Sequence, residues 1–258
     1  MATEIDEYRD LLDAPPTADT LVRGLALVQR LAEVTIELST AESAAPEIRA
    51  NGEHTVISAK TWLDQRPEWS ACDLPKSTKS KAQVAARDAV ATAIALASVA
   101  DVAQSTSVSR SEQSYSLLMD ALVVLVHHAY FYLVPQLKGP QRRYKELLLA
   151  SMGTFAERLP LADGFRIRAL VAQAENHHDN AGELFKAAMA ATHSDADEFM
   201  SVLQTCWTHL IDRKQFVPAL ELLLDTYPRV AREDLDEMKQ LMLMTMQLSN
   251  HKAETVAN

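Results

Sequence analysis

The sequence predicts an all-α protein, and three features of its composition carry this prediction. Only 6 of the 258 residues are glycine. Alanine and leucine are abundant, and runs in which β-branched or aromatic residues alternate with polar ones are nearly absent. Tight hairpin turns between strands need positive φ, which glycine supplies at the lowest cost. Scarce glycine together with many strong helix formers therefore favours helices over a sheet.

The N-terminal part begins with two predicted helices. The first spans residues 3–12, where acidic side chains occupy the positively polarised first turn and Pro15 and Pro16 follow the end. Asp19 opens a longer helix with apolar residues at the 3.6-residue period. A third, short helix is expected over residues 41–50, before the turn-forming dipeptide Asn51-Gly52.

Helical periodicity stops between residues 53 and 80, which predicts a long loop. The loop contains Trp62 and Trp69, and such aromatic residues are rare in disordered segments. Two interpretations remain open: the indole rings pin the loop across the helices, or they contact a partner. The basic stretch from Lys76 to Lys81 is short and lacks interleaved aromatic residues, so it is expected to be a solvated loop rather than a nucleic-acid site.

Three further helices are predicted before the strongest repeat signal, over residues 81–103, 109–137 and 141–158, with Pro160 ending the last. Alanines on one face of the first of these allow a neighbouring helix to approach closely. We interpret residues 1–160 as an irregular helical part that packs onto residues 161–258 in one continuous structural unit.

The apolar segment 117–134 has the length of a membrane span, at 18 residues. It contains Asp120 and the pair His127-His128, however, and a charged residue inside a span costs at least about 2.5 kcal/mol. We therefore expect a helix that is buried nearly all round in a protein core, and no membrane partner.

Charge and cysteine content exclude further classes of function. The net charge of −10 and the pI of about 5.3 repel phosphate backbones, so nucleic acid is not an expected partner. Cys72 and Cys206 are far apart in sequence and are expected to be reduced thiols, although sequence alone leaves a disulfide open. The N-terminus resembles neither a secretory signal nor a transit peptide. These features predict a cytoplasmic location.

The most informative stretch, residues 163–228, reads as two helical hairpins with matching positions of small and large apolar side chains. Each hairpin has anchors on its first helix, followed by an alanine and a large partner four residues later on its second helix. The first hairpin carries Phe165, Ala169, Ala172, Ala181, Phe185 and Ala188, and the second carries Leu203, Trp207, Leu210, Ala219 and Leu223, closed by Tyr227-Pro228.

This layout resembles the tetratricopeptide repeat, whose signature W-x2-L-G-x2-Y is followed by A-x3-F and then Pro. The chain departs from the pattern in several places. Arg168 stands where leucine is usual, Ala169 where glycine is commonest, and His193 where the first closing proline belongs. Trp207 occupies a small-residue position, where it would push the paired helices apart. The hairpins also repeat about four residues later than the usual period of about 34. The alternative is an irregular helical bundle that uses alanine at close contacts.

The resemblance implies antiparallel hairpins stacked as a superhelix that presents a groove to another protein or peptide. The first helix of each hairpin would line that groove. The residues that it implies for partner binding are Arg166, Gln173, Gln204, Ile211 and Asp212. We therefore expect a non-enzymatic interaction or assembly module.

The last predicted helix, residues 232–250, has a thin polar face, although a terminal repeat helix normally needs one. Either the N-terminal helices cover it or it forms a subunit contact, for which flexible methionine side chains are suited. Of the two, we expect the subunit contact: a homodimer through Met238, Met242 and Met246.

Signs of catalysis or metal binding are weak. Glu175 and His178 have the Glu-x-x-His spacing of helical di-iron sites, but no second copy of that motif occurs. His127 and His128 point about 100° apart on a helix, so both cannot face one metal ion. Phosphate loops and Cys-x-x-Cys pairs are absent from the sequence. We predict no catalytic residue, metal or cofactor. The alternative is a helical-bundle enzyme or ligand-binding protein with a pocket near His127, His128, Tyr130 and Tyr132.

Overall fold

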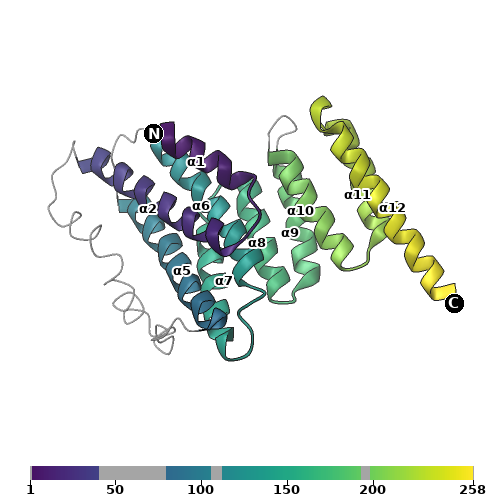
Figure 1. Cartoon of the computed structure of the whole chain (residues 1–258). Helices are drawn as coiled ribbons and strands as arrows, with labels where there is room; N and C mark the ends of the chain where they lie inside the picture. Colours follow the sequence, from purple (N-terminus) through teal and green to yellow (C-terminus); the bar gives the residue numbers. More distant parts are fainter. Residues whose placement is uncertain (1, 41–79, 106–111, 193–197, 258) are drawn as a thin grey trace. The chain divides into compact units, whose positions relative to one another are not determined.

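A computed structural model describes residues 2–40, 80–105, 112–192 and 198–257 (Figure 1). All regular structure within these ranges is helical, which confirms the all-α prediction. The predicted helix at 41–50, Cys72, the tryptophans of the 53–80 loop, the basic stretch up to Lys79 and His193 lie outside the described residues.

The chain divides into two compact units, Met1–Arg158 and Leu159–Asn258. In the first unit α2 packs against α6, and α5 packs against α7. The short α1 contacts both α2 and α6. The helices of this unit are α1 (Ala2–Leu12), α2 (Ala18–Thr40), α5 (Lys81–Ser105), α6 (Glu112–Leu133) and α7 (Arg142–Ala156), with a 3-10 turn at Gly139–Gln141 before α7.

Helix α6 is the apolar helix of this unit. Its segment Tyr115–Leu133 is long and apolar enough to cross a membrane by length and composition, and most of that segment is buried inside the protein. His128 lies in it with 1% exposure, and its Nε2 is 3.0 Å from the Leu11 carbonyl oxygen near the end of α1. The imidazole therefore caps the C-terminal end of α1 from a neighbouring helix.

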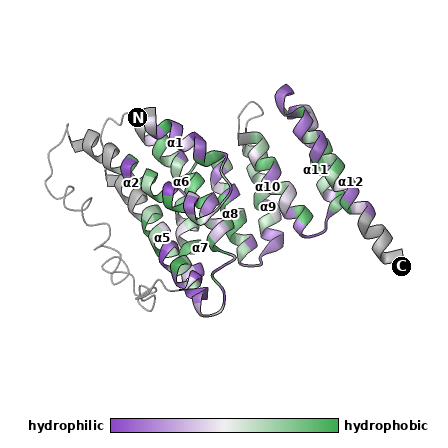
Figure 2. Ribbon diagram, in the orientation of Figure 1, coloured by the Kyte–Doolittle hydropathy of each residue, from purple (hydrophilic) through white to green (hydrophobic). Residues whose placement is uncertain are grey.

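The second unit contains the predicted hairpins. Helices α8 and α9 form one contacting pair, α10 and α11 form the next, and α12 packs against α11 (Figure 1). Hydrophobic residues concentrate on the faces along which these helices meet (Figure 2). The elements are α8 (Leu161–Ala174), α9 (His178–Ala191), α10 (Glu198–Asp212), α11 (Phe216–Thr226), two 3-10 turns at Tyr227–Arg229 and Arg232–Asp234, and α12 (Leu235–Ala257).

Both hairpins turn with the same backbone geometry. Asn176 has a φ of 66° after α8, and Lys214, 38 positions later, has a φ of 58° after α10. In the first turn the His177 amide donates to the Ala172 carbonyl over 2.8 Å, and in the second the Gln215 amide donates to the Leu210 carbonyl over 2.9 Å. This left-handed residue with its six-to-one hydrogen bond is a Schellman motif. The two hairpins are therefore built to one local plan with a 38-residue spacing.

The alanines that suggested the hairpins lie at helix contacts. Ala181 and Ala188 on α9 and Ala219 on α11 each have an exposure of 0%. Contact between α8 and α9 is more extensive than contact between α10 and α11. The second pair has the shorter second helix, and its first helix carries Trp207 where α8 has the small Ala169.

Candidate functional site

Polar side chains connect the first helix of one hairpin to the first helix of the next. Arg166 on α8 donates a hydrogen bond to the Ser201 hydroxyl on α10 over 2.8 Å. The same guanidinium pairs with Asp163 at 2.8 Å, and the side chains of both partners are only 11% exposed. Arg166 therefore sets the spacing between α8 and α10.

The same kind of connection joins α10 to α12. The Gln204 amide donates to the Glu237 carboxylate over 2.5 Å, and the Trp207 indole N–H donates to the Thr245 hydroxyl over 2.8 Å. Thr245 is 1% exposed. Its small side chain lies opposite the indole, so the large ring of Trp207 is accommodated against α12.

Helix α9 accepts hydrogen bonds from later parts of the chain. The Cys206 thiol on α10 donates to the Phe185 carbonyl on α9 over 3.6 Å. Burial raises the pKa of this thiol to about 12, so it stays protonated and unreactive as a nucleophile. Arg229, after α11, donates to the Thr192 carbonyl over 2.8 Å and to the Met189 carbonyl over 3.4 Å at the end of α9. Its guanidinium also lies 4.6 Å from the centre of the Phe199 ring.

The residues implied for partner binding fall into two groups. Arg166 and Gln204 make the structural contacts between helices, whereas Gln173 and Ile211 are half-buried and Asp212 is exposed. The sequence pattern places all five on one face of the first helices. The pattern does not reveal that Arg166 and Gln204 also contact the next first helix and α12, because Ser201 and Glu237 are 35 and 33 positions away in the sequence.

The methionines of the last helix also separate. Met238 has 0% exposure and packs in the core of the second unit, so it does not belong to the exposed face on which we expected it. Met242 is half-buried, and Met246 is 52% exposed. Among the residues of α12 whose burial the structure describes, up to Asn250, the large apolar side chains that are exposed are Leu243, Met244, Met246 and Leu248.

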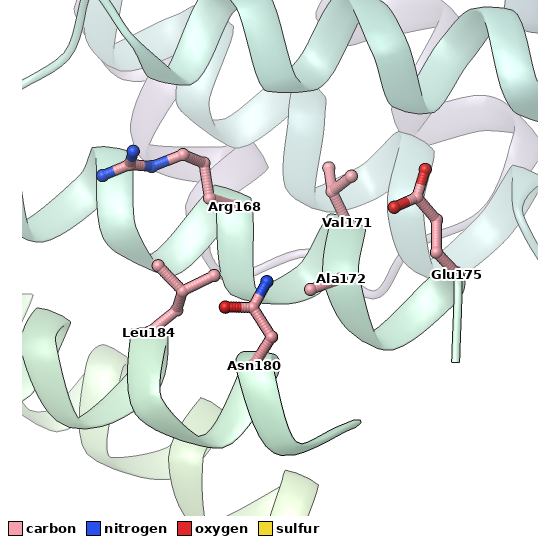
Figure 3. A pocket seen from close by; sticks show the side chains of 6 residues that line it. All are labelled: Arg168, Val171, Ala172, Glu175, Asn180 and Leu184. Atoms are coloured by element: carbon pink, nitrogen blue, oxygen red, sulfur yellow. The ribbon is translucent and has the colours of Figure 1, made fainter. Parts of the chain in front are cut away.

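An open groove of about 320 Å³ lies between α8 and α9 (Figure 3). The small Ala172 leaves room at its centre, and Asn180 places an amide beside it. The side chains of Arg168 and Glu175 lie at opposite ends of the groove, and the guanidinium of Arg168 points away from Glu175. The lining residues are Arg168, Val171, Ala172, Glu175, Asn180 and Leu184.

The groove lies on a different flank of α8 from the predicted binding face. Arg168 follows Arg166 by two positions, which is about 200° around a helix. Since Arg166 contacts α10, the groove opens on the side away from α10. In the sequence, Arg168 stands out only as a departure from the repeat pattern. A charged residue at a position that is usually apolar was the signal that could have identified the groove.

A pair of histidines lies where α9 meets α10. The His178 and His209 rings are 6.5 Å apart, and the Phe185 ring is 5.0 Å from His209. Both Nδ1 atoms are buried without a hydrogen-bond partner among the described residues, and His209 is 2% exposed. Burial lowers the pKa of His209, and Arg213 and His178 lower it further while Asp212 opposes them. The lowered pKa keeps His209 neutral near pH 7, so its ring serves as a packing group between α9 and α10.

Side chains that could hold a metal ion do not gather in groups of three or more in the part of the chain that the structure describes. The Glu175 carboxylate is 3.5 Å from the Nδ1 of His177, which is exposed in the same turn. His178, the other half of the Glu-x-x-His spacing, packs towards His209 instead.

Comparison with protein-family models, with curated proteins and with solved structures found no match. The geometry of the two hairpins is therefore what bears on function.

Proposed function

We propose that this chain is a non-enzymatic protein–protein interaction module whose second unit is a tetratricopeptide-like stack of hairpins. The observation that carries the proposal is the recurrence of one Schellman turn at a 38-residue spacing, together with the contacts that run from α8 to α10 and from α10 to α12. Stacked hairpins of this kind expose extended surfaces that suit another chain.

The surface offered to that partner is polar and partly acidic. Gln173, Ile211 and Asp212 remain available on the first helices, while Arg166 and Gln204 hold those helices at a fixed spacing. A rigid spacing lowers the entropy lost on binding, because the surface does not have to be ordered by the partner. The occupant that fits this role is another protein or a peptide in a cytoplasmic setting.

A second copy of the chain is the occupant that we propose for the exposed face of α12. Leu243 and Met246 are 59% and 52% exposed, and flexible methionine side chains adapt to an opposing surface. A twofold dimer would cover this face with the commonest symmetry of soluble homo-oligomers.

The rival function, an enzyme or ligand-binding protein with a pocket at His127 and His128, receives less support. His128 caps α1 through its contact with the Leu11 carbonyl, which explains a buried histidine in α6 without any chemistry. The tilted contact between the rings of His127 and Phe131, with centres 4.6 Å apart, is likewise a packing contact.

The test is selection of a displayed random-peptide library on the immobilised full chain, with an unrelated helical bundle as background. Selected peptides are then synthesised, and their Kd is measured for the wild type and for Gln173→Glu/Asp212→Arg. We expect enrichment of a peptide class whose binding weakens about tenfold in this variant, whereas Asp225→Arg, at an exposed site on α11, leaves it unchanged. Failure to enrich any peptide over the background would overturn the proposed function.

A further inference from the structure

We propose that the groove between α8 and α9 binds an amphipathic helix that carries an acidic and a basic residue seven positions apart, with an apolar side chain between them. The inference rests on the proposed interaction function and names the chemistry of one partner. It is independent of the predicted binding face, because the groove lies on the opposite flank of α8.

The second hairpin shows what this flank accepts. With the 38-residue spacing of the turns, Arg168 and Val171 correspond to Cys206 and His209 on α10. In that hairpin the flank is covered by a helix, because Cys206 contacts the Phe185 carbonyl of α9 and His209 packs on the Phe185 ring at 5.0 Å. The corresponding flank of α8 therefore has the shape on which this fold docks a helix.

The charges at the ends of the groove define the partner's pattern. Arg168 is held there by its stacking over the Phe165 ring, 4.8 Å from the ring centre, and by an Nε contact of 3.4 Å with the Gly164 carbonyl. Glu175 lies seven residues along α8, a rise of about 10.5 Å, and its side chain is 48% exposed. A helix lying along α8 has the same rise per residue. An acidic residue at its first position and a basic residue at its eighth would face Arg168 and Glu175.

The centre of the groove takes an apolar anchor. The apolar surface at the centre comes from Val171, Ala172 and Leu184. Ala172 is 4% exposed. The space exists because its side chain is small, and not because a mobile side chain has moved aside. On a helix, the fourth and fifth residues lie on the same face as the first and the eighth. A leucine there would enter the groove in the way that Phe185 covers Cys206 and His209. This is recognition of a helix in a groove through spaced anchors.

The experiment uses three stapled helical peptides that share a leucine at the fourth position and differ only at the first and eighth. One carries Glu and Lys, one carries Lys at both positions and one carries Glu at both. The Glu/Lys helix can place its acidic residue at Arg168 and its basic residue at Glu175 in only one direction, and it is free to take that direction. The two like-charged helices cannot match both ends in either direction, so the test does not require the direction to be known. Binding to the full chain is measured by fluorescence anisotropy.

The wild type should prefer the Glu/Lys helix by roughly fivefold over either like-charged helix. Arg168→Glu should transfer the preference to the Lys/Lys helix, and Glu175→Arg should transfer it to the Glu/Glu helix. Lys186→Glu is the matched control: it reverses an exposed charge on α9 outside the groove, so the preference of the wild type should persist. Ala172→Leu should fill the groove and weaken all three peptides.

Two failures are distinguishable. If library-selected peptides bind the chain but neither charge reversal transfers the preference, the groove is not the docking site and the interaction function stands. If the chain binds neither the selected peptides nor the three helices, the interaction function itself is overturned. Far-UV circular dichroism of each variant establishes that the fold is retained.

Discussion

The indole N–H of Trp207 donates a hydrogen bond to the hydroxyl of Thr245 over 2.8 Å, from α10 to α12. Thr245→Val keeps the shape of the side chain and removes the acceptor. We expect a loss of about 1–2 kcal/mol in the free energy of unfolding, because the indole loses its partner. Thr205→Val is the control, since the Thr205 hydroxyl donates to the Ser201 carbonyl within α10 and lies at a more exposed site. The free energies of unfolding are measured in urea. Equal losses in the two variants would contradict a stabilising role for the bond between Trp207 and Thr245.

The two hairpin turns differ in the residue that holds positive φ. Lys214 has a φ of 58°, in a region that favours glycine or asparagine, and Asn176 has a φ of 66° at the matching position. We expect Lys214→Gly to raise the free energy of unfolding by about 0.5–1 kcal/mol. Asn176→Gly should change it little, because asparagine already tolerates this conformation. Thermal unfolding of the two variants side by side measures the difference.

Ala181 is fully buried at the contact between α8 and α9. Ala181→Leu should overpack this contact and lower the free energy of unfolding by about 1–3 kcal/mol. Ala190→Leu places the same side chain at an exposed position on α9 and serves as the control. An equal effect of the two substitutions on the melting temperature would count against the close contact.

His209 makes stability depend on pH. Its pKa in the folded state is lowered by burial, Arg213 and His178, whereas an unfolded histidine titrates near about 6.5. As the pH falls below that value, the unfolded chain binds a proton that the folded chain does not. The free energy of unfolding therefore falls as the pH drops below about 6.5, and above that pH it does not depend on His209. His209→Phe should flatten the decline between pH 6.5 and 5.5 by up to about 1.4 kcal/mol per pH unit. Urea unfolding at a series of pH values measures this. Between pH 7.5 and 8.5 the histidine is neutral in both the folded and the unfolded chain, so the free energy of unfolding should depend on pH in the same way for wild type and variant.

The exposed face of α12 is expected to join two copies of the chain. Leu243→Glu/Met246→Glu places charges at side chains that are 59% and 52% exposed, and should convert a dimer into a monomer in light scattering at micromolar concentration. Gln247→Glu, at an exposed polar position on the same helix, should leave the dimer intact. A wild-type chain that is already monomeric would overturn this expectation.

The helices could be predicted because their signals are local. Acidic first turns, prolines after helix ends and spaced alanines lie within one or two turns of the features that they specify. The hairpin elements α8 to α11 accordingly lie where the alanine and aromatic spacing indicated.

The candidate groove and the contacts between hairpins could not be predicted in the same way. Arg229 bonds the Thr192 carbonyl 37 positions away, and Cys206 reaches the Phe185 carbonyl 21 positions away. Such pairs depend on how the helices are placed, and a single sequence contains no pattern that pairs them. Met238 shows the same limit: three methionines at helical spacing look equivalent in the sequence, but the packing of α12 buries one and exposes another.

The bonds from Arg229 to the end of α9 give the second unit a cooperativity that nearest-neighbour packing lacks. In an array where each helix contacts only the next, the last elements can fray while the earlier ones stay folded. Here Arg229, which follows α11, donates hydrogen bonds to the Met189 and Thr192 carbonyls at the end of α9. For α10 to separate from its neighbours, these bonds from the guanidinium would have to break. Amide protons of α9, α10 and α11 should therefore exchange with solvent through one shared opening event, as a single foldon.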